Sequence, residues 1–137
     1  MRFAIFLGCT APVRTPNYEK ATRAVCEELG FQLIDLPFTC CGFPIEALRT
    51  DTALTMAARN LAEAERSEAT ILTMCGACAG MLTKTNNLLR NDEETRGKVT
   101  SNLKMLGYEY SCSVKVNHFA RFLFEEVGIE KIRRRIT

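Results

Sequence analysis

Two short segments of this chain are apolar on both of their faces. Residues 2–8 read RFAIFLG and residues 69–74 read ATILTM. Strands of this kind are typical of a parallel sheet that helices cover on both sides. Two weaker runs, residues 31–36 (FQLIDL) and residues 114–117 (VKVN), complete a set of four expected strands. The sequence therefore favours a mostly parallel sheet of four strands.

Helical patterns separate the expected strands. Residues 17–29 carry apolar side chains at helical spacing and stop at Gly30, and residues 51–67 open on Asp51 as an expected N-cap. Further helices are expected at residues 78–89, 93–106 and 119–127, the last resuming after Gly128. Strands that alternate with helices imply βαβ units. We expect an α/β fold, a small Rossmann-like four-stranded sheet flanked by helices, with residues 1–137 as a single domain.

Seven cysteines in 137 residues stand out in the composition. An odd number, with no recognisable secretory segment, argues against a disulfide-bonded secreted protein. The apolar run after Met1 is far too short to span a membrane. We expect a soluble cytoplasmic protein, because clustered cysteines in a reducing compartment generally serve metal or redox chemistry. The formal net charge of +2 is too small to indicate nucleic acid as a partner.

Five of the cysteines lie where expected strands end. Cys9 follows the first strand, and Cys40 and Cys41 follow the second. Cys75 closes the third strand, and Cys78 lies in the first turn of the next helix. Because the carboxyl ends of parallel strands lie at one edge of a sheet, we expect these five thiols to meet there. Free amides at the start of the helix favour thiolates at the same edge.

Three kinds of chemistry are open to five thiols on one edge. A structural zinc ion takes four ligands, usually as two short pairs, so five candidates with two adjacent suit it poorly. An iron–sulfur cluster has several metal corners and is generally held by thiolates, so the residues favour it. Metal-free dithiol–disulfide exchange by Cys75 and Cys78 stays open, because they form a CxxC pair at a strand-to-helix turn.

The cysteine pattern resembles a known family. Cys9, the Cys40-Cys41-Gly42 triplet and the Cys75–Cys78 pair resemble the CCG cysteine-rich domain found in the B subunit of heterodisulfide reductase. The resemblance covers nearly the whole chain and extends to residues 6–9 (FLGC), 57–61 (AARNL) and 118–119 (HF). The intervals between the cysteine groups are slightly shorter here than in the family.

The resemblance implies a cofactor and a reaction. It implies that Cys9, Cys40, Cys41, Cys75 and Cys78 hold a non-cubane 4Fe-4S cluster and act through it in catalysis. The implied reaction is reductive cleavage of a disulfide, either the coenzyme M–coenzyme B heterodisulfide or a related substrate. The implied partners are the ferredoxin-like C subunit, which delivers electrons, and the flavin-bearing A subunit.

One departure from the family affects this expectation. The B subunit of the family normally contains two CCG modules, whereas this chain contains one. The chain is then either a fragment or a one-module relative that pairs with itself or with another subunit. An electron-transfer or scaffold module without its own substrate is therefore the alternative to a disulfide reductase.

The remaining candidates have structural interpretations beside functional ones. His118, the only histidine, follows the fourth strand at the edge of the five cysteines; it is either structural or a proton donor or hydrogen-bond partner of the site. Cys26 and Cys112 are expected to be core and turn residues without a ligand role. The basic run at residues 131–135 (KIRRR) indicates a solvated helix end or, alternatively, a docking patch for an acidic partner.

Overall fold

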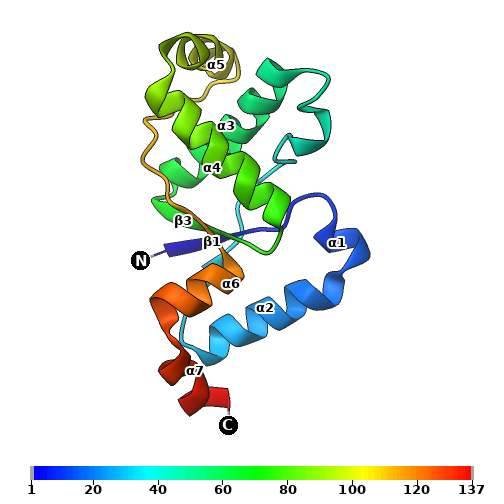
Figure 1. Ribbon diagram of the computed structural model, residues 1–137, viewed down its shortest axis with the longest axis vertical. Coiled ribbons are helices and arrows are strands. Elements are labelled where there is room, and N and C mark those ends of the chain that lie inside the picture. The colour runs from blue at the N-terminus through cyan, green and yellow to red at the C-terminus, as the bar shows by residue number, and fades with distance from the viewer. Residues whose placement is uncertain (1, 137) are drawn as a thin grey trace.

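Four parallel strands form a sheet at the centre of the fold (Figure 1). The computed structural model describes residues 2–136, so the first and last residues of the predicted domain lie outside this range. The strand order is β2-β1-β3-β4, with every neighbouring pair parallel. The strands are β1 (Arg2–Phe6), β2 (Leu33–Ile34), β3 (Ala69–Thr73) and β4 (Val116–His118). Their register pairs Phe6 with Thr73 and Thr73 with His118, so three carboxyl ends are aligned at one edge.

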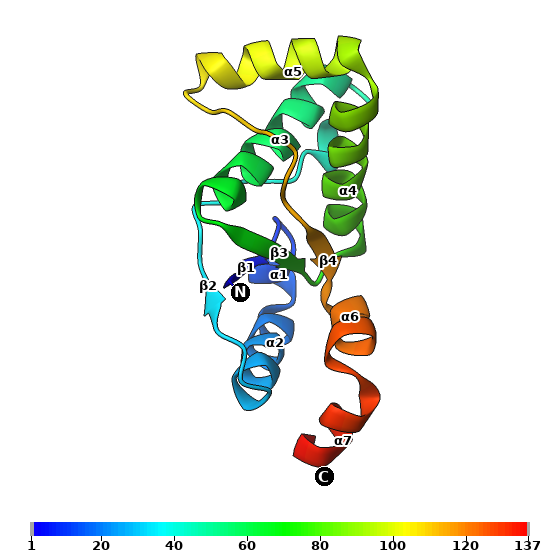
Figure 2. The ribbon, with the colours of Figure 1, turned by 90° about the vertical axis from the view of Figure 1, so that its left-hand side faces the viewer.

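Helices cover both faces of the sheet (Figures 1 and 2). On one face lie α2 (Pro16–Glu28) and α6 (Phe119–Phe122), and on the other lie α3 (Thr50–Arg66) and α4 (Gly76–Asn91). The outermost helix, α5 (Glu93–Met105), packs across α3 and α4. Shorter elements are α1 (Ala11–Arg14), the 3-10 turn η1 (Phe43–Ile45), the π-helical turn η2 (Leu123–Val127) and α7 (Ile129–Ile136). The predicted α/β class with a flanked parallel sheet is confirmed.

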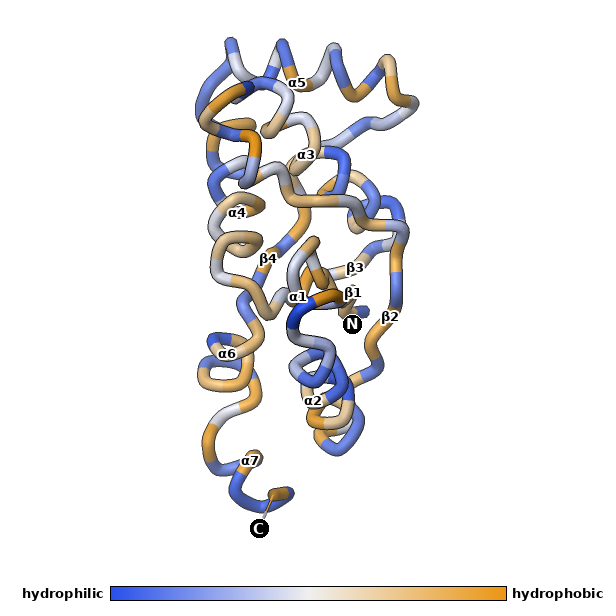
Figure 3. The backbone as a smooth tube through the Cα atoms, turned by 90° about the vertical axis from the view of Figure 1, so that its right-hand side faces the viewer, coloured by the Kyte–Doolittle hydropathy of each residue, from blue (hydrophilic) through white to orange (hydrophobic). Residues whose placement is uncertain are grey.

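The two faces of the sheet bury separate apolar clusters. Phe6 and Ile71 pack toward α3 and α4, where Leu61 is fully buried. Phe3 points the opposite way, and its ring centre lies 5.1 Å from that of Phe122 on α6. Alternation of side chains along the strands therefore supplies both clusters, as a strand apolar on both faces predicts. Figure 3 shows the contrast with α5, where hydrophilic and hydrophobic residues alternate around an outer helix.

Several boundaries differ from the expectation. The expected N-cap Asp51 lies inside α3, which begins at Thr50 with Arg49 as its N-cap. The expected helix over residues 119–127 changes from α to π geometry at Leu123 and ends at Gly128, whose φ of +85° turns the chain. The short α1 and η1 are not evident from periodicity, because one turn of helix carries no repeat to detect. No helix between residues 2 and 136 has the length and apolar character that crossing a bilayer requires.

Candidate functional site

The five candidate cysteines follow strand ends of the sheet. Cys9 lies in the turn between β1 and α1. Cys40 and Cys41 lie in the irregular segment between β2 and η1. Cys75 follows β3 as the N-cap of α4, and Cys78 lies in the first turn of that helix. The chain therefore supplies these thiols from three loops and one helix start, as the topology rule for parallel sheets predicts.

Neighbouring thiols in this set interact with one another. The side chains of Cys9 and Cys40 interact between the loops after β1 and β2. Cys41 interacts with both Cys40 and Cys78, and Cys78 also interacts with Cys75. These pairwise interactions link the five thiols in the order Cys9, Cys40, Cys41, Cys78 and Cys75, a set that we call the cysteine row. Within residues 2–136, no three histidine, cysteine or acidic side chains enclose a point suited to a single metal ion.

Protonation differs along the cysteine row. Side-chain hydrogen bonding with Cys78 lowers the pKa of Cys41 to about 6, against the effect of burial and with help from the Phe43 N–H. The same hydrogen bond, together with burial, raises the pKa of Cys78. Burial also raises the pKa of Cys40, although the Gly42 N–H lies 3.5 Å from its sulfur. Cys41 is therefore the first of the pair to become a thiolate, the form in which cysteine binds metals.

Two glycines let the backbone approach the row closely. Gly8 has a φ of +71°, and a Cβ atom there would lie 2.8 Å from the Sγ atom of Cys78. Gly42 has a φ of +94°, and a Cβ atom there would lie 2.5 Å from the carbonyl oxygen of Ala53 in α3. Since real Cβ contacts are longer than 3 Å, neither position accommodates a side chain without a shift. The loop that carries Cys9 therefore touches α4, and the loop that carries Cys40 and Cys41 touches α3.

A buried asparagine on α3 holds the loop that carries Cys40. Asn60 is fully buried. Its Nδ2 donates to the carbonyl oxygens of Thr39 and Cys40, each at 3.1 Å, and its Oδ1 accepts from the Thr39 N–H at 2.9 Å. This role is not evident in the sequence alone, although an amide side chain between the apolar residues Ala58 and Leu61 is the signal for such a contact.

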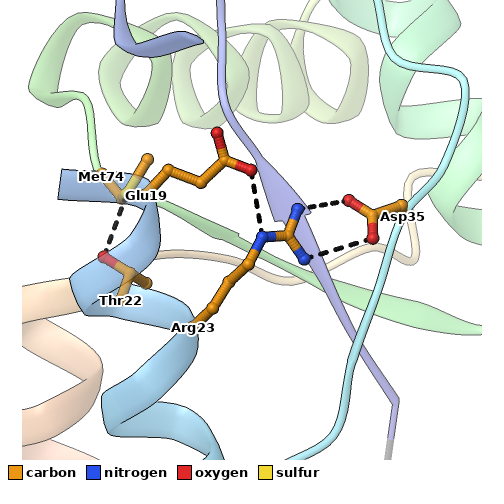
Figure 4. A network of polar contacts seen from close by, with 5 residues as sticks. All are labelled: Glu19, Thr22, Arg23, Asp35 and Met74. Carbon is orange, nitrogen blue, oxygen red and sulfur yellow. Dashed lines mark hydrogen bonds and ion pairs between the residues drawn. The ribbon is translucent and has the colours of Figure 1, made fainter. Parts of the chain in front are cut away.

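Helix α2 is hydrogen-bonded to two segments that lead to row cysteines (Figure 4). Arg23 donates to both carboxylate oxygens of Asp35, at 2.6 and 3.2 Å, and so reaches the loop after β2. One residue earlier, the Thr22 hydroxyl donates to the sulfur of Met74 at 3.0 Å. Met74 is buried at the end of β3, immediately before the cysteines of α4. Helix α2 therefore holds both the segment that precedes Cys40 and Cys41 and the residue that precedes Cys75.

His118 lies at the expected edge of the sheet, where both of its ring nitrogens bind backbone groups. Its Nδ1 accepts from the Ala120 N–H at 3.1 Å and so caps α6. Because Nδ1 is an acceptor, Nε2 carries the proton and donates to the carbonyl oxygen of Met74 at 3.1 Å. His118 therefore connects α6 to the residue before Cys75. Its role as a structural residue, a proton donor or a hydrogen-bond partner of the site stays a prediction.

The two other cysteines lie outside the row. Cys26 is buried between α2 and the sheet, in the same cluster as Phe3 and Phe122. Cys112 lies in the loop before β4 with a φ of +63°, and its carbonyl oxygen accepts two hydrogen bonds from Arg90.

A small cavity lies beside the row. It has a volume of about 200 Å³ and lies between the loops that follow β1 and β2. Leu7 and Gly8 line it from the first loop and Pro12 from α1, and Phe38 and Thr39 are among the residues that line it from the second loop. Its walls are thus the chain neighbours of Cys9 and Cys40.

Comparison with protein families matches residues 3–83 to the CCG cysteine-rich domain, a stretch that contains all five row cysteines. The chain belongs to the CCG cysteine-rich domain family. The CCG domain described here is 37% identical to the B subunit of the ferredoxin/F420H2-dependent CoB-CoM heterodisulfide reductase of Methanosarcina acetivorans. It is 36% identical to the B subunit of the ferredoxin:CoB-CoM heterodisulfide reductase of Methanosarcina mazei. Each alignment covers 99% of this chain and 46% of the relative, so the chain spans about half the length of these curated relatives.

A solved structure shares the fold of the CCG domain. The crystal structure of a hypothetical protein from Helicobacter pylori aligns with a TM-score of 0.80 over 90% of this chain and 25% of that chain. At 22% sequence identity, the likeness concerns the α/β fold alone. The family resemblance expected from the cysteine pattern is confirmed by the family match and by the two heterodisulfide reductase relatives.

Proposed function

We propose that this CCG domain is an iron–sulfur redox module that takes part in the reductive cleavage of a disulfide. The observation that carries the proposal is the row of five interacting thiols at one edge of the sheet, within the segment matched by the CCG family. The names of the two heterodisulfide reductase relatives support the reaction class, with the CoB-CoM heterodisulfide or a related disulfide as the substrate.

The donor set of the row suits an iron–sulfur group. All five members are thiols, the ligands that such clusters generally use, and their number exceeds the four ligands of a structural zinc ion. The unpaired N–H groups in the first turn of α4 lie beside Cys75 and Cys78 and favour negative charge there. We assign Cys9, Cys40, Cys41, Cys75 and Cys78 as the residues that would hold a non-cubane 4Fe-4S cluster. Such a cluster supplies one-electron transfer when it is bound.

The surrounding residues hold the thiols in place. Asn60 fixes the backbone before Cys41, and His118 and Thr22 fix Met74 ahead of Cys75. Gly8 lets the first loop reach Cys78. A site whose ligands are held by such contacts changes shape little when a redox state changes, which favours electron transfer.

Partners and location are part of the same proposal. Because the two relatives are named as B subunits of heterodisulfide reductases, we propose that this chain works in a complex, and that the complex lies in the cytoplasm. The proposed partners are the ferredoxin-like C subunit, as electron donor, and the flavin-bearing A subunit. A second CCG module, or a second copy of this chain, is a further proposed partner.

The small size of the cavity beside Cys9 and Cys40 favours one alternative. Its volume of about 200 Å³ lies below the range of roughly 300–1,000 Å³ that is usual for ligand pockets. An electron-transfer or scaffold module without its own substrate is therefore the second candidate. Turnover of the heterodisulfide by this chain alone, with a chemical reductant, would exclude it.

Iron and sulfide analysis after anaerobic purification tests the proposal. We expect about four irons per chain, and a large loss of iron when serine replaces any one of the five row cysteines. Cys26→Ser and Cys112→Ser are matched controls that should keep their iron. Fewer than about two irons per chain in the unmodified protein would contradict the cluster and leave zinc or dithiol chemistry by Cys75 and Cys78.

A further inference from the structure

Helix α7 lies beyond α2 and α6, at the end of the molecule opposite α5 (Figures 1 and 2). It packs against η2, and the Nζ atom of Lys131 lies 4.9 Å from the ring centre of Phe31. A helix of eight residues is too short to be stable in water through its own hydrogen bonds. The stability of α7 therefore depends on the packing of its side chains against other parts of a structure.

Positive charge is concentrated on α7. The helix contains four basic residues and one acidic residue, a net charge of +3. The whole chain has a formal net charge of +2, so the residues outside α7 sum to −1. Arg134 and Arg135 are exposed in the last turn of the helix. This excess charge is a local feature of one end of the molecule.

An apolar surface adjoins the charge. Phe124 is 68% exposed and Ile129 is 49% exposed, although both are large apolar side chains. A hollow of about 570 Å³ lies between η2 and α7, and these two residues line it together with Val127, Gly128, Lys131, Arg134 and the acidic Glu130, which is ion-paired with Arg133. Figure 3 shows hydrophobic and hydrophilic residues alternating along α7. We call this region, made by Phe124, Val127, Ile129, Lys131, Arg134 and Arg135, the α7 surface.

We propose that the α7 surface docks an acidic segment of another polypeptide. Charge complementarity carries the choice of partner, because carboxylates would meet Arg134 and Arg135 while an apolar side chain enters the hollow beside Phe124. A bilayer fits less well: the hollow is concave, Lys131 is turned onto the ring of Phe31, and α7 presents only eight residues. The proposal is independent of the cysteine row and holds whether or not the chain carries iron.

Peptide binding to the whole chain tests the proposal. The probe is a fluorescein-labelled, 16-residue synthetic peptide with leucine and glutamate at helical spacing, and a second peptide carries serine in place of each leucine. In a fluorescence anisotropy titration, we expect Arg134→Gln/Arg135→Gln to weaken binding of the leucine peptide by about tenfold or more, and Phe124→Ser to weaken it by a similar factor. Lys98→Gln/Lys104→Gln, a matched change on the exposed side of α5, should leave the affinity unchanged.

Each other outcome overturns the proposal. Equal affinity for the serine peptide would show attraction by charge alone, and equal affinity of the Arg134/Arg135 variant would place binding elsewhere. Binding to phosphatidylserine vesicles without binding to the leucine peptide would make the occupant a membrane. Far-UV circular dichroism of each variant verifies that the chain is folded. Iron content, measured in parallel, tests the cluster proposal separately from peptide binding.

Discussion

At Asn60, a single side chain makes three hydrogen bonds to the backbone of two successive residues, Thr39 and Cys40. The segment from Asp35 to Gly42 has no regular structure, so its peptide groups have no partners in a helix or sheet ladder. Asn60 supplies those partners from inside the protein. The position of Cys40 and Cys41 therefore depends on a residue that touches neither sulfur.

Replacing Asn60 with alanine is expected to remove iron as well as stability. The change leaves a peptide N–H and two carbonyl groups without partners, so we expect the free energy of unfolding to fall by about 2–4 kcal/mol. We also expect the iron content per chain to fall, because the Cys40 loop is no longer fixed. Urea denaturation and iron analysis measure the two effects.

Asn86→Ala is the matched control for this prediction. Asn86 is also a buried asparagine, and it bonds to the Val114 carbonyl and to Tyr110, on the β4 side of α4. We expect it to lose stability and retain iron. Equal iron loss in both variants would show that the effect of Asn60 is general destabilisation.

A comparison of Gly8 with Gly30 separates the effect of a strained backbone from the effect of steric contact with Cys78. Both have a positive φ, +71° and +82°, but only at Gly8 would a Cβ atom meet Cys78. Alanine at either position is expected to cost about 1–2 kcal/mol of stability through the left-handed conformation. Only Gly8→Ala should also lower the iron content. Unchanged iron in Gly8→Ala would mean that Cys78 moves without consequence.

Among the connecting segments, the loop between α5 and β4 is bound at two of its serines by one carboxylate. Glu65 on α3 accepts hydrogen bonds from the N–H and hydroxyl groups of Ser111 and of Ser113. Partial burial works against the ionised form, but these hydrogen bonds outweigh it and lower the pKa of Glu65. The loop is thereby fixed to α3 without a helix or strand of its own.

Glu65→Gln is expected to destabilise the protein in a pH-dependent way. Because the folded state lowers the pKa of Glu65, the carboxylate stabilises the fold fully above the ordinary value of 4.5. That stabilisation is lost as the pH falls through the folded-state pKa. We expect a loss of about 1–3 kcal/mol at pH 7, and a shrinking difference from the unmodified protein below about pH 4.5.

Urea denaturation at several pH values measures this difference. Glu109→Gln, at an exposed glutamate of the same connection, is the control and should show little effect. A constant difference between pH 7 and pH 3 would contradict the assignment of the effect to the Glu65 carboxylate.

Some of these elements can be predicted from the sequence because they leave a local pattern, whereas others depend on tertiary packing. The two apolar runs around Ile5 and Ile71 predict central parallel strands, because burial on both faces leaves a local pattern. The position of the row cysteines at one edge of the sheet can be predicted from those strands. The interactions between their thiols cannot, because they depend on the folded structure. The contact of Asn60 with the Cys40 loop and the π-helical turn at Leu123 depend on tertiary packing, so no local pattern encodes them.

Across the whole molecule, the folded core and the proposed cluster are largely separate. Two apolar clusters, one on each face of the sheet, contain mostly residues other than the row cysteines. Cys41 and Cys78 are 3% and 4% exposed, and each adds only a small side chain to the cluster that packs against α3 and α4. The iron-free domain should therefore keep its architecture.

Iron removal is expected to lower stability without unfolding the domain. After anaerobic treatment with a chelator and a thiol reductant, far-UV circular dichroism should be nearly unchanged. The thermal midpoint should fall by several degrees or more, because a ligand that binds the native state stabilises it by mass action. A large loss of helical signal on iron removal would instead show that the cluster is required for folding.

The placement of the row cysteines also sets an order of assembly during biosynthesis. The loop that carries Cys9 meets Cys78 only after β1 has paired with β3, a contact between segments far apart in the chain. Such non-local pairing is slow compared with the growth of a helix. A nascent chain therefore has no complete receptor for metal until its central strands have met. If the proposed cluster is bound, its delivery would accordingly be a late event, directed at a folded acceptor and not at the emerging polypeptide.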